Sequence, residues 1–239
     1  MSREFKVHRK FYEDGRQLYK KASIILEPGI TVLIGCNGAG KTTLQTAIYD
    51  DLRMKNIPVI RYDNLEKGGS NSLSELMFRA DYSTAAQLWC DSEGEAITDN
   101  LVRYAAHLKY FIEHGHEKLS DLERIFRDDP GDSESSERWI LFDAIDSGLS
   151  IDQVQDVKAY FFSVLKDLAK EHDLYIVVTA NEYEMCRGEN CFSVSESKYV
   201  PINSYEEYSA AILKSREYKD KMMQKLAEAM KKKEEKKNQ

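Results

Sequence analysis

Residues 35–42 read Gly-Cys-Asn-Gly-Ala-Gly-Lys-Thr, and this stretch decides the fold. It fits the pattern G-x-x-x-x-G-K-[S/T] without a mismatch. Glycine has no Cβ, so such a loop can curl and point its backbone N–H groups inward at an anion. A short β-branched run (ITVLI) precedes the loop, and a plausible helix (TLQTAIYDDLRM) follows it. The order strand, glycine-rich loop and helix predicts a phosphate-binding loop.

This loop assigns roles to individual residues of a nucleotide site. Lys41 can reach the β- and γ-phosphates, and the hydroxyl of Thr42 can bind Mg²⁺. The helix that follows adds the positive end of its dipole. We therefore expect ATP and Mg²⁺ as cofactors and Lys41 as a catalytic residue. The residues expected to bind the nucleotide in this loop are Asn37, Gly38, Ala39, Gly40, Lys41, Thr42 and Thr43.

A second stretch, ILFDAIDSGLS at residues 140–150, supplies the acid that such a site needs. Large apolar residues run into Asp143, which we expect to end a buried strand and to hold the metal with Thr42. The next position often carries an acid that activates water, but here it is Ala144. Asp146 is the first acid that could replace it. A general base contributes about 10²–10⁴-fold, so its loss predicts slow hydrolysis.

The succession of elements predicts an α/β domain with a mainly parallel central sheet. The first 29 residues resemble antiparallel strands, with a turn at EDGR. Ser150 and Gln153 match a capping box at the start of a long helix. The further expected strands are IPVIRY, RWILFD and LYIVVT, and the expected helical segments are Leu73–Arg127, Ser150–His172 and a long amphipathic C-terminal helix from Ser204.

The two motifs resemble those of ABC-type ATPase domains. The P-loop of that family commonly reads G-x-N-G-x-G-K-[S/T]-[S/T], and its Walker B and D-loop stretch reads D-E-x-x-S-G-L-D. In this chain the SGL element is intact at residues 147–149. The pair Ile145-Asp146 is closer to the SMC and RecF branch, and the chain is also similar to small AAA/ABC-like ATPases of bacteria and phages. The resemblance implies a P-loop NTPase fold with a small helical subdomain.

The resemblance also implies an ATP-dependent homodimer. In this family two subunits enclose two ATP molecules, and a signature serine of one chain faces the γ-phosphate bound by the other. The signature candidates are Ser92 and Gly94, in the sequence SEGE before a predicted helix. The same residues also fit an ordinary Ser-x-x-Glu capping box.

Several residues that the family uses are replaced in this chain. After the strand LYIVVT the family has a switch histidine, whereas here Asn181 could hydrogen-bond a γ-phosphate or water. Glu182, beside it, is a second acid that could replace the missing base. Asp63 and Asn64 occupy the region of the metal-contacting Q-loop.

An aromatic residue that stacks on adenine is possible at Tyr12 or Tyr19, although either could also be a strand residue that faces the core.

The domain boundaries follow from the motifs and the charge pattern. Residues 1–218 are expected to form one ABC-like ATPase domain, with a helical insertion over about 70–137 and a lysine-rich helical or disordered tail over 219–239. The tail has eight lysines against four acids, +4, so the rest carries −7 − 4 = −11. This balance argues against a uniformly basic nucleic-acid surface. The tail is either a solvated helix end or a contact for phosphates or an acidic partner.

The expected location is the cytoplasm. No apolar stretch approaches the roughly 20 residues needed to cross a bilayer, and the first ten residues lack the apolar core of a signal peptide. The cysteines are few and scattered, which favours free thiols over a metal site. Nothing in the chain indicates a membrane partner. Nucleic acid as a partner is suggested only by the resemblance to the SMC and RecF branch. An unidentified protein partner is also possible.

The leading hypothesis is a Mg²⁺-dependent, slow ABC-type ATPase that acts as a nucleotide-driven switch. One alternative is a P-loop kinase that transfers phosphate to a small acceptor. Such kinases usually need an arginine-rich lid, whereas Arg124, Arg127 and Arg138 flank an acidic loop. Another alternative is a nucleotide-gated regulatory module with no hydrolysis.

Overall fold

The computed structural model describes residues 2–7, 10–11, 16–64, 93–118, 131–168 and 172–237. Its centre is a six-stranded sheet with the order β10-β9-β5-β8-β7-β6. All neighbours in this sheet are parallel except β10, which is antiparallel to β9. The strands are β5 (Gly29–Ile34), β6 (Val59–Asp63), β7 (Glu137–Asp143), β8 (Asp173–Thr179), β9 (Asn190–Ser193) and β10 (Lys198–Val200).

The N-terminal strands form two separate antiparallel pairs. Strand β1 (Arg3–Lys6) pairs with β4 (Ser23–Leu26), and β2 (Lys10–Phe11) pairs with β3 (Arg16–Gln17). The predicted α/β class, with a mainly parallel sheet and antiparallel N-terminal strands, is therefore confirmed.

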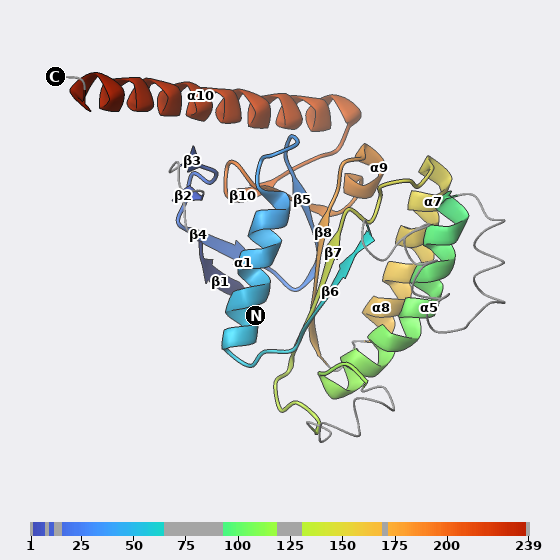
Figure 1. Cartoon of the computed structure of the whole chain (residues 1–239). Coiled ribbons are helices and arrows are strands. Elements are labelled where there is room, and N and C mark those ends of the chain that lie inside the picture. Colours follow the sequence, from blue (N-terminus) through green and yellow to red (C-terminus); the bar gives the residue numbers. More distant parts are fainter. Residues whose placement is uncertain are drawn as a thin grey trace.

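The helices of the described residues cover both faces of the sheet (Figure 1). In place of one regular helix after Ser150, the chain forms two α-helical segments joined by a π-helical turn, η1. The predicted capping contact is present, because Gln153 Oε1 accepts the N–H of Ser150 at 3.0 Å. The helical segments are α1 (Lys41–Met54), α5 (Glu93–His114), α7 (Ile151–Asp156), η1 (Val157–Phe162), α8 (Ser163–Leu168), α9 (Tyr183–Cys186) and α10 (Tyr205–Lys237).

The alternation of side chains along the strands divides the core into two layers, because successive strand residues point to opposite faces. In β7, Ile140 and Phe142 pack with α5, η1 and α8, whereas Trp139 and Leu141 pack with α1 and the β1–β4 pair. Figure 1 shows the same division, with α1 and α5 on opposite sides of the sheet. Both faces are thus buried, as the continuous apolar runs of these strands require.

The parallel strands bring the functional segments to one edge of the sheet. Strands β5, β6, β7 and β8 run in the same direction, so their carboxyl ends lie together. In open α/β sheets, ligands bind outside the carboxyl ends of the strands. The P-loop follows β5, and Asp143 and Thr179 end β7 and β8.

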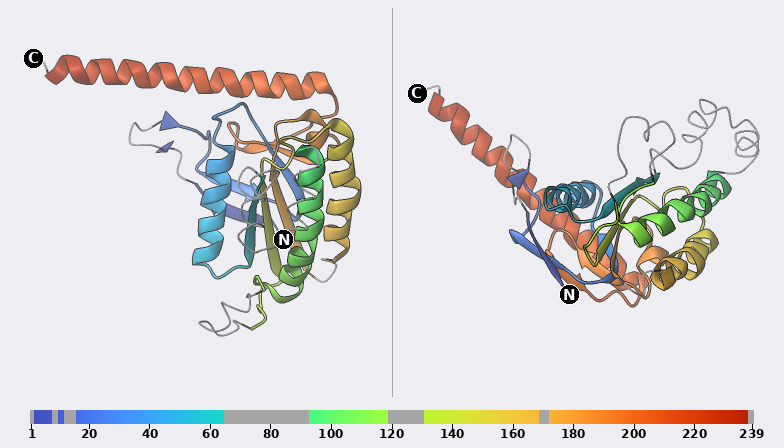
Figure 2. Two further views of the ribbon diagram at one scale, coloured as in Figure 1. Left: turned by 45° about the vertical axis from the view of Figure 1, so that its right-hand side comes forward. Right: turned by 90° about the horizontal axis from the view of Figure 1, so that it is seen from below.

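Helix α10 lies across this edge and extends beyond the β2–β3 pair (Figures 1 and 2). It runs without a break from Tyr205 to Lys237, through the position where the sequence suggested the start of a tail. In the N-terminal third of α10, Lys214 pairs with Glu196 at 2.9 Å. Among the helices of the described residues, none is long and apolar enough to span a membrane.

Candidate functional site

The P-loop has the backbone shape that an anion cradle needs. Gly38 and Gly40 have φ angles of 74° and 93°, in the left-handed region that favours glycine. A Cβ on Gly40 would stand 3.0 Å from Leu18 Cδ1, so a larger residue would require the Leu18 side chain to shift in addition to the unfavourable positive φ. Gly40 also precedes α1 and has no side chain that could cap the first N–H groups of this helix. These N–H groups and the helix dipole therefore face the place where a phosphate would bind.

Lys41 is folded back over this cradle. Its ammonium group donates a hydrogen bond to the carbonyl of Gly35 at 2.9 Å. Burial lowers the pKa of Lys41, while the negative charges of Asp146 and Asp143 act in the opposite direction. A desolvated ammonium group gains from each further negative charge, so a phosphate is a fitting ligand.

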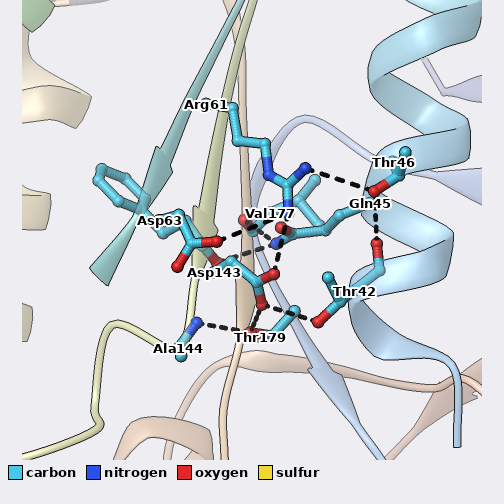
Figure 3. Close-up of polar contacts among 10 residues, drawn as sticks. Thr42, Gln45, Thr46, Arg61, Asp63, Asp143, Ala144, Val177 and Thr179 are labelled. Atoms are coloured by element: carbon cyan, nitrogen blue, oxygen red, sulfur yellow. Dashed lines mark hydrogen bonds and ion pairs between the residues drawn. The ribbon is translucent and has the colours of Figure 1, made fainter. Parts of the chain in front are cut away.

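Thr42 and Asp143 meet at the carboxyl end of β7 (Figure 3). The Thr42 hydroxyl donates to Asp143 Oδ1 at 3.2 Å, and the Thr179 hydroxyl donates to the same oxygen at 2.5 Å. Hydroxyl and carboxylate oxygens fit Mg²⁺, which usually takes one or two protein ligands and fills its octahedron with water and phosphate oxygens. Among the described residues no group of three or more His, Cys, Asp or Glu could hold a metal ion.

Arg61 belongs to this cluster of contacts, although the sequence did not single it out. From β6 it reaches Asp143, with 3.1 Å between Nη2 and Oδ2, and its Nη1 donates to Thr46 Oγ1 at 3.3 Å (Figure 3). The signal in the sequence was an arginine inside the otherwise apolar run IPVIRY. The sequence could not identify Asp143 as its partner. The two residues meet because β6 and β7 are parallel neighbours in a register that aligns Asp63 with Asp143.

Ala144, which directly follows Asp143, adopts a left-handed conformation with φ 52°. Its N–H group donates to Thr179 Oγ1 at 2.8 Å. Asn64 holds the turn that follows, because its Nδ2 donates to the carbonyls of Ala144 at 3.1 Å and Ser147 at 3.0 Å. The segment after β6 thus contributes a buried side chain that fixes the turn after β7.

Asp146 is buried, with 2% of its surface exposed. Its Oδ2 accepts the N–H groups of Asn181 at 2.7 Å and Glu182 at 2.8 Å. Its Oδ1 has no hydrogen-bond partner within the described part of the chain. Burial raises the pKa of Asp146, partly offset by these two backbone donors. The carboxylate therefore positions the segment after β8 and keeps one oxygen unengaged.

The side chains of Asn181 and Glu182 are exposed at the start of α9. The carbonyl of Asn181 accepts a hydrogen bond from the Tyr208 hydroxyl at 2.5 Å. The structure thus brings the candidate switch residues close to Asp146 through their backbone, while both side chains point into solvent.

Helix α10 contacts the tip of the P-loop, which the sequence did not indicate. Lys219 donates to the carbonyl of Asn37 at 2.9 Å, and Ser215 Oγ accepts the N–H of Cys36 at 3.2 Å. The amide of Ala39 is used within the loop, because it donates to the carbonyl of Cys36 at 3.0 Å. Thr43 lies in the first turn of α1.

Among the aromatic and signature candidates, Tyr19 contacts the P-loop. Tyr19 is fully buried and donates its hydroxyl to the carbonyl of Gly40 at 3.0 Å, so it supports the P-loop from the core. Ser92 and Tyr12 lie outside the described residues, and Gly94 is placed in the first turn of α5.

No family model and no curated protein matches this chain. Solved structures do. A nucleotide-free ATP-binding cassette from an ABC transporter is 13% identical with a TM-score of 0.43, over 90% of this chain and 95% of that one. The ADP conformation of another such cassette is 14% identical with a TM-score of 0.42, over 87% and 93%. A cassette from Clostridium perfringens, part of an ABC transporter complex, is 15% identical with a TM-score of 0.42, over 84% and 86%.

Proposed function

We propose that this chain is a Mg²⁺-dependent ABC-type ATPase that binds ATP, hydrolyses it slowly and forms an ATP-dependent homodimer as a nucleotide-driven switch. The observation that carries the proposal is the 3.2 Å contact between the Thr42 hydroxyl and Asp143, directly beside the P-loop. This arrangement places two oxygen ligands next to a helix N-terminus that no side chain caps and that is suited to bind an anion.

ATP and Mg²⁺ are supported by the charges of the site. Lys41, the loop N–H groups and the dipole of α1 provide the positive potential that a triphosphate needs. When bound between Thr42 and Asp143, Mg²⁺ would neutralise charge on the β- and γ-phosphate oxygens.

Slow hydrolysis is supported by the surroundings of Ala144. A methyl group stands after Asp143, and the next acid along the chain, Asp146, uses one oxygen to hold two backbone N–H groups. Positioning and charge stabilisation by Lys41 remain available without a strong base.

The homodimer is supported by the SGL element, which forms a turn at the carboxyl edge of the sheet with Gly148 exposed. The test is light scattering of the full chain at high protein concentration, with ATP and Mg²⁺ and without them. We expect a mass twice that of the monomer only with nucleotide. A strictly monomeric protein that binds ATP would exclude the homodimer, and absence of ATP binding would exclude the whole proposal.

Of the three arginines that flank the acidic loop, Arg124 and Arg127 lie outside the described residues, and Arg138 does not support the kinase alternative. Arg138 is buried and donates to the carbonyl of Ile112 at 2.7 Å, so it serves the C-terminal end of α5 and cannot belong to a mobile lid. Phosphate transfer to added nucleosides or nucleotides would revive this alternative.

A further inference from the structure

A cation of the protein already occupies the carboxylate where the proposed function requires Mg²⁺. Arg61 Nη2 lies 3.1 Å from Asp143 Oδ2, and Arg61 Nη1 is anchored on Thr46 (Figure 3). A guanidinium group stays protonated at all physiological pH values. Its charge at this position is therefore permanent.

Both oxygens of Asp143 are engaged. Oδ1 accepts hydrogen bonds from the hydroxyls of Thr42 and Thr179, and Oδ2 accepts one from Arg61. A carboxylate oxygen has about two lone-pair sites, so Oδ1 is filled and Oδ2 faces the guanidinium. Mg²⁺ binds oxygen at about 2.0–2.1 Å. A metal ion on Asp143 would therefore meet the charge of Arg61 at close range.

We infer that Arg61 is a resident cation of the nucleotide site, which competes with the divalent metal for Asp143 and supplies part of the positive charge that a triphosphate requires. This inference rests on the proposed nucleotide binding. Coupling between two ligands of one site is reciprocal. The Arg61–Asp143 pair therefore weakens metal binding by the same factor by which the metal weakens the pair.

A second acid, Asp63, lies beside Arg61. Asp63 is the register partner of Asp143 across β6 and β7, and its Oδ2 lies 4.0 Å from Arg61 Nη2. Arg61 thus stands between two neighbouring carboxylates. Without its charge these two acids would repel each other and would attract a divalent cation more strongly.

The alternative role of Arg61 is a structural link between β6, β7 and α1. Both roles predict a loss of stability when the side chain is removed. Only the resident cation predicts that the metal dependence of nucleotide binding changes, because a structural link carries no coupling to the metal.

The decisive quantity concerns a fluorescent, non-hydrolysable ATP analogue. It is the dissociation constant measured in EDTA divided by the dissociation constant measured in Mg²⁺. It is measured for the full-length wild type, Arg61→Met, Arg61→Gln and Arg61→Lys. Arg53→Met is the control, since Arg53 is an exposed arginine of α1 with its guanidinium 5.8 Å from the ring centre of Tyr49.

We expect the ratio to rise about tenfold in Arg61→Met and Arg61→Gln, because the analogue loses the resident charge in EDTA and the metal gains a free acid. Arg61→Lys keeps the charge and should remain close to the wild type, as should Arg53→Met. Gln can still donate to Asp143, so it separates the charge from the hydrogen bond.

An unchanged or smaller ratio in the folded neutral variants would overturn the inference. If Arg61→Met does not fold, as judged by circular dichroism, the comparison of Arg61→Gln with Arg61→Lys decides it. A wild type that binds the analogue neither with metal nor without it would instead refute the proposed function.

Discussion

The P-loop and the carboxyl edge of β7 form one site, but the chain builds them in different ways. The P-loop is a run of consecutive residues, 35–42, whose shape depends on glycines at fixed spacing. The edge of β7 is assembled from α1, β6, β7 and β8, and its contacts join residues far apart, such as Arg61 and Asp143. The P-loop, the first half of the site, is encoded by neighbouring residues. The edge of β7, the second half, is encoded by the register of the strands. Mutations in the P-loop should therefore lower nucleotide affinity together with turnover, whereas mutations at the edge of β7 should change hydrolysis or metal dependence.

The largest effect should come from Lys41→Ala in the P-loop. It removes a charge-assisted contact worth about 1.5–3 kcal/mol, so ATP affinity should fall roughly 10–100-fold and turnover should be abolished. Fluorescence titration and phosphate release would measure both. Lys55→Ala is the matched control at the other end of α1, where Lys55 pairs with Asp51 on the surface. Unchanged affinity in Lys41→Ala would break the assignment of the P-loop half.

The fold and the P-loop were predictable because each depends on short-range patterns. A strand, a glycine-rich loop and a helix are recognisable within 25 residues, and the apolar runs identify the buried parallel strands. The contacts of Asp143 were not predictable beyond Thr42. Thr179 and Arg61 reach it only because β6, β7 and β8 are neighbours in one register, which no local pattern specifies.

The contacts of Asp146 could not be predicted from the sequence either. Its position after Asp143 indicated a replacement base, but the sequence could not show that the carboxylate binds the backbone of residues 181 and 182. The contact of α10 with the P-loop was also hidden, because an amphipathic helix does not reveal which surface it covers.

The edge of β7 would be tested next by Asp146→Asn and Glu182→Gln. A general base contributes about 10²–10⁴-fold, so hydrolysis should fall about 100-fold in the variant that removes it. We expect this in Asp146→Asn, since Asp146 is buried and near Lys41, whereas Glu182 is exposed. Single-turnover phosphate release would measure it, with Asp152→Asn as an exposed control. Wild-type rates in both variants would remove both acids as bases.

A smaller effect is expected where α10 is held near the P-loop. Glu196 pairs with Lys214, Lys20 and Lys198 at 2.9, 3.1 and 3.5 Å. Hydrogen bonding to Lys214 lowers the pKa of Glu196 to about 2, partly opposed by burial. A pKa below the ordinary value of 4.5 means that the stabilisation is present above about pH 4.5 and is lost as the pH falls toward 2.

Glu196→Gln should therefore lower the free energy of unfolding by about 1–2 kcal/mol at pH 7, a value reduced for the exposure of the lysines. The difference from the wild type should shrink toward zero near pH 2. Urea unfolding at both pH values would measure it. Lys214 is next to Ser215, whose hydroxyl accepts the N–H of Cys36 in the P-loop. Glu196→Gln therefore acts on the P-loop only indirectly, and nucleotide affinity should fall only slightly. A large loss of affinity would show that the P-loop half depends on α10 and is not encoded by its own residues alone.

The smallest effect concerns the strained backbone at Ala144. A left-handed conformation costs a non-glycine residue about 1–2 kcal/mol, and glycine avoids this cost but loses more entropy on folding. Ala144→Gly should therefore raise the free energy of unfolding by about 0.5–1 kcal/mol in urea titrations. Ala106→Gly, at an exposed position inside α5, should lower it by about 1 kcal/mol. Loss of stability in both variants would mean that the Ala144 methyl group is held by packing, and that the edge of β7 carries no backbone strain.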